Sequence, residues 1–127
     1  MHPNGLKNIP VNNRDICVPI LSIHGIGDLL APFHMEQIYA QRVAEKGASD
    51  FLVSRAIRDF VHCEFAAGEY ETAFLDLVNW VETGEKPEED DILDPAVVAD
   101  PYFGCQFTTE DRDYTWFDPM LFIPPCP

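Results

Sequence analysis

The stretch Val18-Pro19-Ile20-Leu21-Ser22-Ile23-His24-Gly25-Ile26-Gly27-Asp28 decides the fold that we predict for this chain of 127 residues. Its apolar run, Val18 to Ile23, stops at two glycines and is followed by a carboxylate, Asp28. A run that is apolar on both faces and rich in β-branched residues is typical of a strand in a parallel sheet covered by helices. We therefore expect a buried strand with Asp28 just past its carboxyl end.

A helix and a second strand complete a βαβ unit. Residues 33–46 place apolar side chains on one helical stripe, and Gly47 is suited to end that helix. Residues 51–57 form the second predicted strand, and His62 lies in the loop that follows it. Parallel strands end at the same edge of a sheet, where open α/β sheets bind ligands. We expect Asp28 and His62 to meet at that edge.

Three segments make up the predicted organisation of the chain. Residues 1–16 are polar and turn-rich and form an N-terminal loop, and residues 17–87 form the α/β domain. A further helix over residues 69–83 has apolar side chains at i, i+3, i+4 spacing, with Gly84 as its cap. Residues 88–127 are acidic and rich in proline and aromatic residues. A disordered linker carries few aromatic residues, so this extension is expected to pack irregularly over the domain.

The acidity of the chain excludes some classes of partner. A formal net charge of −14 argues against nucleic acid and anionic membrane surfaces, because both require a basic patch. Two acidic runs, residues 88–91 and 110–113, are interpreted as solvated loops, since neither has the ligand spacing of a calcium-binding loop. No stretch approaches the length of a membrane span.

Two other kinds of site are considered and set aside. His24, Asp28, His34 and His62 include suitable metal ligands, but no spacing forces them together, so we expect neither a metal nor a cofactor. The four cysteines have no CxxC spacing, and their pairing stays open. Cys63 follows His62 directly, and neighbouring side chains in an extended loop point apart. We expect a buried structural thiol there, or a disulfide partner for Cys105.

An acid and a histidine at neighbouring strand ends are typical of triad hydrolases. In such enzymes the acid orients the histidine, and the histidine takes the proton from a nucleophilic hydroxyl or thiol. Asp28 and His62 meet this requirement by their place in the topology. Taken singly, Asp28 is also suited to a simple turn and His62 to a surface loop, but their joint placement favours the functional interpretation.

The residues around both positions resemble the α/β-hydrolase superfamily. The segment 24–32 is similar to its "HGxxDxxxP" element, and the form "HCxF…LVxWVExGxxP" from His62 onward resembles serine hydrolases of the esterase and amidase kind. The resemblance covers roughly residues 17–87. It implies that Asp28 is the triad acid and His62 the triad base. Val61 stands where the superfamily commonly has glycine.

The nucleophile of that superfamily is missing from this chain. None of the three serines, Ser22, Ser49 and Ser54, lies in a G-x-S-x-G elbow. The resemblance therefore implies a partial α/β-hydrolase fold, with two parallel strands, two flanking helices and an irregular C-terminal extension. Its parent enzyme would act on a small-molecule ester or amide, and we expect the isolated chain to be inactive.

Two alternatives belong to other functional classes. In the first, the chain is one piece of a split or truncated enzyme and acts only with a nucleophile-bearing partner that supplies the N-terminal part of the fold. The exposed edge of a two-stranded sheet would favour that association. In the second, the chain is a non-catalytic acidic interaction module, and Asp28 and His62 are remnants. A large distance between these two side chains would favour the second alternative.

Overall fold

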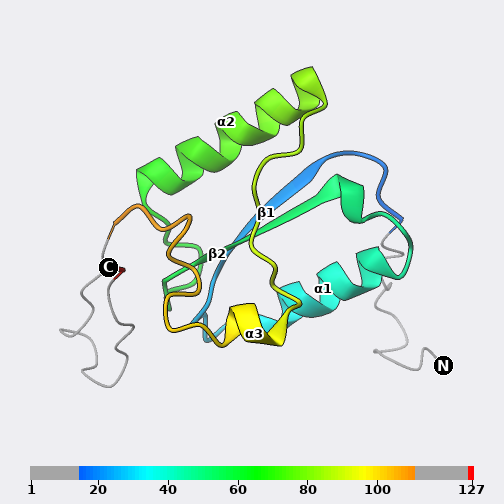
Figure 1. The fold of residues 1–127 in the computed structure, drawn as a ribbon. Helices are drawn as coiled ribbons and strands as arrows, with labels where there is room; N and C mark the ends of the chain where they lie inside the picture. The colour runs from blue at the N-terminus through cyan, green and yellow to red at the C-terminus, as the bar shows by residue number, and fades with distance from the viewer. Residues whose placement is uncertain (1–14, 111–125) are drawn as a thin grey trace.

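In the computed structural model, which describes residues 15–110 and 126–127, a two-stranded sheet lies between two helices (Figure 1). The mixed α/β architecture with two parallel strands is as predicted. The elements in chain order are β1 (Ile20–Gly25), α1 (His34–Ala44), the 3₁₀ turn η1 (Ser49–Phe51), β2 (Leu52–Ile57), α2 (Ala67–Thr83) and the short α3 (Pro95–Val98).

The two strands pair in parallel and in step, because Ile20 lies opposite Leu52 and Gly25 opposite Ile57. Both strands therefore end at the same level, as the topology of a βαβ unit requires. Each strand is shorter at its start than predicted. Pro19 has no N–H to give to a ladder, so β1 begins after it. Phe51 closes a 3₁₀ turn, so β2 begins only at Leu52.

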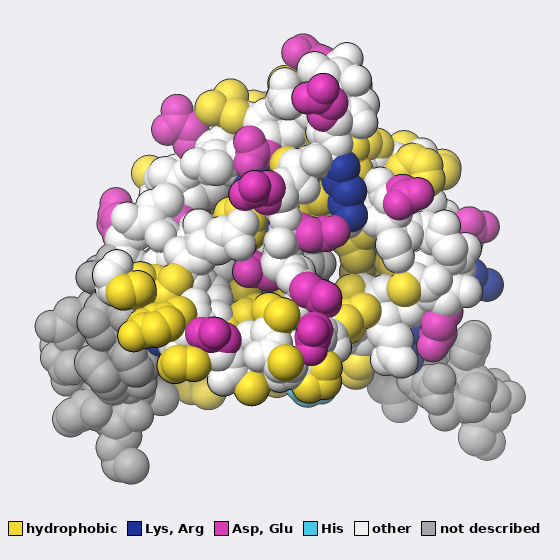
Figure 2. All heavy atoms as spheres, in the orientation of Figure 1, with side chains coloured by type: hydrophobic (Ala, Val, Ile, Leu, Met, Phe, Trp, Pro, Cys, Tyr) yellow, Lys and Arg dark blue, Asp and Glu magenta, His cyan; other side chains and the backbone are white. Residues whose placement is uncertain are grey.

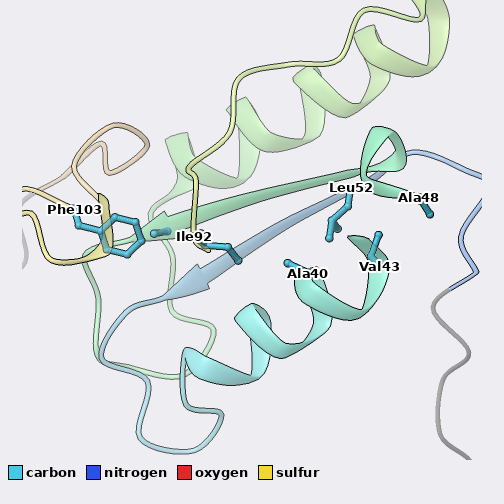
Figure 3. Packing of buried hydrophobic residues seen from close by; sticks show 7 residues of the cluster. Ala40, Val43, Ala48, Leu52, Ile92 and Phe103 are labelled. Atoms are coloured by element: carbon cyan, nitrogen blue, oxygen red, sulfur yellow. The ribbon is translucent and has the colours of Figure 1, made fainter. Parts of the chain in front are cut away.

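Alternation along β2 assigns its side chains to two layers. The face toward α1 forms the main core, in which Val43 is fully buried (Figure 3). This core contains Ala40, Val43, Ala48, Leu52, Ala56, Ile92 and Phe103. The opposite face lies under α2, where Arg55 pairs with Asp76. The sheet thus separates two layers, each covered by one helix (Figure 1).

Polar side chains within the buried strand β2 have specific partners. Ser54 donates a hydrogen bond of 3.0 Å to Oε1 of Glu36 on α1. Nη2 of Arg55 lies 2.6 Å from Oδ2 of Asp76, and its guanidinium carbon is 4.2 Å from the ring centre of Phe107. These partners allow a strand with all six residues buried to contain a serine and an arginine.

Helix α2 covers the sheet with only part of its apolar face. Ala73 is buried, as the periodicity predicts, and Trp80, which lies outside the predicted apolar series, is buried as well. Gly84 ends the helix at φ +80°. However, three large side chains on the flank of the same face remain exposed: Tyr70, Phe74 and Val81. We refer to these three residues as the α2 stripe. The sheet below is too narrow to cover it.

The free edge of β2 is covered by the C-terminal extension. Asp90 donates its N–H to the Ser54 carbonyl at 3.0 Å and accepts a 2.8 Å hydrogen bond from the Ala56 N–H through Oδ2. Farther along, the Arg58 N–H donates to Oγ1 of Thr108. The acidic run 88–91 is therefore not wholly solvated as predicted, because Asp90 is half-buried and burial raises its pKa.

The described part of the extension packs over the domain and contains the short helix α3. Ile92 and Phe103 are buried in the main core, and Nη1 of Arg58 donates to the Phe103 carbonyl at 2.9 Å. Acidic side chains are spread over the face shown in Figure 2, which has very few basic ones. The aromatic residues of the segment 111–125 lie outside the described residues. No helix among the described residues is long and apolar enough to cross a membrane.

Candidate active site

The two strand ends are tied to each other by their backbones. Beyond β1, the Ile26 N–H donates to the Ile57 carbonyl at 2.9 Å, and the Gly27 N–H donates to the Asp59 carbonyl at 2.8 Å. A Cβ on Gly27 would lie only 2.7 Å from Cβ of Phe60, so glycine permits this close approach. The loops that carry Asp28 and His62 therefore leave the sheet in contact.

The carboxylate of Asp28 is held by its own loop. Its Oδ1 accepts hydrogen bonds from the N–H groups of Leu30 at 2.8 Å and Ala31 at 2.9 Å. Burial by itself raises the pKa of Asp28, but hydrogen bonds from the Ala31 amide and from His62 outweigh it. The net result lowers the pKa from 3.8 to about 2, so the carboxylate is ionised at neutral pH.

His62 meets the second oxygen of this carboxylate. Its Nδ1 lies 2.7 Å from Oδ2 of Asp28. Only 4% of the Asp28 side chain is exposed, against 45% of the His62 side chain. The loop behind His62 is anchored to α2, because the Tyr70 hydroxyl donates to the Cys63 carbonyl at 2.9 Å. The pair thus consists of a buried, fixed acid and an accessible imidazole.

The hydrogen bond to Asp28 also sets the tautomer of His62. A carboxylate only accepts, so Nδ1 carries the proton, and Nε2 of the neutral ring keeps its lone pair. This nitrogen is the one on the side away from Asp28. A histidine held in this way can accept a proton from a group placed at Nε2, which is the task of a general base.

The predicted meeting of Asp28 and His62 is confirmed, while their catalytic role stays a prediction. The sequence analysis missed that His24, in β1, holds the loop that carries Asp28. Its Nε2 donates to the Ala31 carbonyl at 2.7 Å, and its ring packs edge-on against Phe33. The "HGxxD" spacing contained the signal, because the histidine lies one strand position before the first glycine.

Both expectations for Cys63 are wrong. Its side chain is exposed and its thiol is free, and Cys105 pairs with Cys126 instead. Cys63 does not point away from the histidine either, because Sγ lies 3.6 Å from Nε2 of His62. The prediction assumed an extended loop, but Cys63 has φ +56°. This left-handed conformation turns its side chain back toward the ring.

The other residues considered for chemistry do not join this pair. No group of three or more His, Cys, Asp and Glu side chains in residues 15–110 and 126–127 is arranged to hold a metal ion. Ser54 is buried against Glu36, on the face of the sheet that packs on α1. Two surface hollows, of about 310 and 470 Å³, are lined without Asp28 or His62.

The chain is similar to an amidase. Over 77 residues it is 32% identical to an o-phthalyl amidase of Xanthobacter agilis. The match takes in 59% of this chain and 17% of the amidase, so the chain spans about a sixth of the length of this relative. No protein-family model matches the sequence, and no solved structure matches it.

Proposed function

We propose that this chain is the acid- and histidine-bearing part of a serine hydrolase of the α/β-hydrolase type, which cleaves amide or ester bonds through an acyl-enzyme. The proposal rests above all on the 2.7 Å hydrogen bond between Nδ1 of His62 and Oδ2 of Asp28. His62 would act first as general base and then as general acid. Asp28 would orient the ring and stabilise its protonated form.

The similarity to an amidase supports hydrolysis of an amide as the first choice of reaction. The nucleophile would come from a polypeptide segment that is not in this chain, because none of Ser22, Ser49 and Ser54 follows a nucleophile-elbow pattern. The same segment would supply the oxyanion donors. The isolated chain would then contribute geometry and a base, but no acyl transfer.

The sheet offers a place for that segment. Asp90 and Thr108 make hydrogen bonds to the outer edge of β2, whereas no described residue pairs with the outer edge of β1. Five of the six residues of β1 are only half-buried, although all six residues of β2 are buried. We propose that a parallel strand of the nucleophile-bearing part pairs with β1. Its neighbouring helices would cover the α2 stripe.

A chimera tests the proposed function. The 77-residue matching segment of the o-phthalyl amidase is replaced by the corresponding residues of this chain, and amide hydrolysis is measured. The chimera is expected to hydrolyse the amide, and His62→Ala in it is expected to lower kcat by about 10³-fold or more. His34→Ala, at the exposed start of α1, is the matched control and should leave kcat within about twofold.

The alternative of a non-catalytic acidic module makes the opposite prediction. That alternative was to be favoured by a large distance between Asp28 and His62, and the observed distance is 2.7 Å. If the chimera folds and binds substrate but His62→Ala is as active as its parent, the catalytic proposal is wrong. The acidic-module interpretation would then account better for this chain.

A further inference from the structure

The Asp28–His62 pair continues to a third side chain within this chain. Nδ1 of His62 faces Oδ2 of Asp28 at 2.7 Å, and Nε2 faces Sγ of Cys63 at 3.6 Å. Nε2 of the neutral ring carries a lone pair, so the thiol donates and the imidazole accepts. Carboxylate, imidazole and thiol thus stand in the order that activates a cysteine in thiol chemistry.

Access distinguishes this sulfur from a structural thiol. Cys63 is exposed and not in a disulfide, and its histidine partner has 45% of its side chain exposed. The positive φ of Cys63, +56°, holds the sulfur on the ring side, and the Tyr70 hydroxyl fixes the Cys63 carbonyl. An accessible thiol beside a base held by a buried carboxylate is the environment in which cysteines react selectively.

We propose that Cys63 is a thiol-modification site, at which a low-molecular-weight disulfide reacts with the sulfur while His62 acts as the base. Nε2 of His62 takes the thiol proton, and the sulfur attacks one sulfur atom of the disulfide. The new S–S bond forms as the old one breaks, and the departing thiolate takes the proton from His62 and leaves as a thiol. The product is a mixed disulfide on Cys63 and one free small thiol.

The adduct would have a consequence for the base. It adds bulk to a sulfur that lies 3.6 Å from Nε2, the nitrogen that must receive the proton of the nucleophile. This step rests on the proposed function: in the assembled hydrolase, modification of Cys63 would block the base, and a reducing agent would restore it. Cys63 would then be a reversible control point for His62.

The chain contains its own reference thiol for the test. Cys17 is also free and exposed, and its side chain makes no hydrogen bond within the described residues. Two single-thiol variants, Cys17→Ser and Cys63→Ser, are treated with 4,4′-dithiodipyridine under native conditions, and the released thiopyridone is followed. This probe is neutral, so the net charge of −14 does not bias its approach. Peptide mapping locates the adduct.

We expect Cys63 to react about tenfold faster than Cys17, a smaller factor than a well-aligned general base provides. His62→Gln should reduce the Cys63 rate to that of Cys17, and the matched control His34→Gln should not change it. Equal rates for the two thiols in the single-thiol variants that keep His62 would overturn the proposal. So would a Cys63 rate that His62→Gln leaves unchanged. If His62→Gln does not fold, Asp28→Asn replaces it, and the ratio of the Cys63 rate to the Cys17 rate decides in the same way.

The regulatory consequence is measured separately in the chimera. Treatment with the disulfide should lower amide hydrolysis, dithiothreitol should restore it, and Cys63→Ser should abolish this sensitivity. A modified but fully active chimera would overturn the control of His62 by Cys63. A chimera without any hydrolysis would instead contradict the proposed function. The thiol reaction itself needs no acyl transfer, so the two proposals can fail independently.

Discussion

The hydrogen bond between Asp28 and His62 joins a buried acid to a partly exposed histidine: 4% of the acid side chain and 45% of the histidine side chain are exposed. The other oxygen of the acid accepts hydrogen bonds from two backbone N–H groups, so the acid is held in place independently of the histidine. The histidine then directs Nε2 away from the acid. This asymmetry fits the proposed role of His62 as a base for a nucleophile that another segment supplies.

Asp28→Asn in the chimera should lower kcat by about 10³- to 10⁴-fold. The amide keeps an oxygen for the Leu30 and Ala31 N–H groups, but it presents an NH₂ donor to Nδ1 of His62. The ring would then carry its proton on Nε2, the wrong nitrogen for a base. Asp94→Asn, at the exposed N-cap of α3, is the control and should leave kcat unchanged. Equal kcat values for both variants would contradict the role of Asp28.

Acid should weaken the fold through Asp28 over a defined range. The pKa of this group is lowered from 3.8 to about 2, so its ionised form contributes stability that is complete above about pH 4. That contribution is lost as the pH falls toward 2. Urea unfolding of the native chain and of Asp28→Asn from pH 6 to pH 2 measures it. The stability difference should shrink below pH 4, and a constant difference would disprove the linkage.

The charge of Asp90 should affect stability in the opposite direction to that of Asp28. Burial raises its pKa, so the folded state favours the protonated form, and stability is lost as the pH rises through the pKa of the folded state. Asp90→Asn removes the charge and keeps an oxygen for the Ala56 N–H. It should stabilise the chain at pH 7, with the gain vanishing below the ordinary pKa of 3.8. Asp91→Asn, at an exposed neighbour, should have no such effect.

Gly27→Ala should disturb the contact between the two strand ends. Its Cβ would meet Cβ of Phe60 at 2.7 Å, and the loop from Phe60 leads directly to His62. We expect a loss of about 1–3 kcal/mol in the free energy of unfolding, and a larger fractional loss of kcat in the chimera. Gly68→Ala faces only the Thr109 side chain, at 3.3 Å, and should be nearly neutral. Urea denaturation of both variants compares them.

Buried and exposed apolar side chains of α2 should respond differently to truncation. Trp80→Ala removes a side chain that is 5% exposed and should cost about 3–5 kcal/mol of stability. Phe74→Ala removes one that is 65% exposed and should change stability by no more than about 0.5 kcal/mol in the isolated chain. In the chimera, Phe74→Ala should become clearly destabilising. If it stays neutral there, the α2 stripe is not covered by the added part.

The sequence was most informative where one local pattern determines the structure. The apolar run ending at Gly25 and the periodicity around Ala73 predict a strand and a helix, and parallel pairing then brings Asp28 and His62 together. Three features follow from no such pattern. Asp90 is half-buried because a distant strand edge needs an acceptor, and Phe74 is exposed because the sheet is narrow. Cys63 turns toward His62 because of one backbone dihedral.

The hydrogen bonds that Asp90 and Thr108 make along β2 also limit how further strands could be added to the described sheet. Among the described residues, β1 alone presents an unpaired strand edge, and one added strand would saturate it. Two copies that pair through their β1 edges would likewise leave no open edge, so strand pairing would stop at a dimer. Growth into an indefinite ribbon needs two open edges on each subunit, and the sheet of the described residues has one.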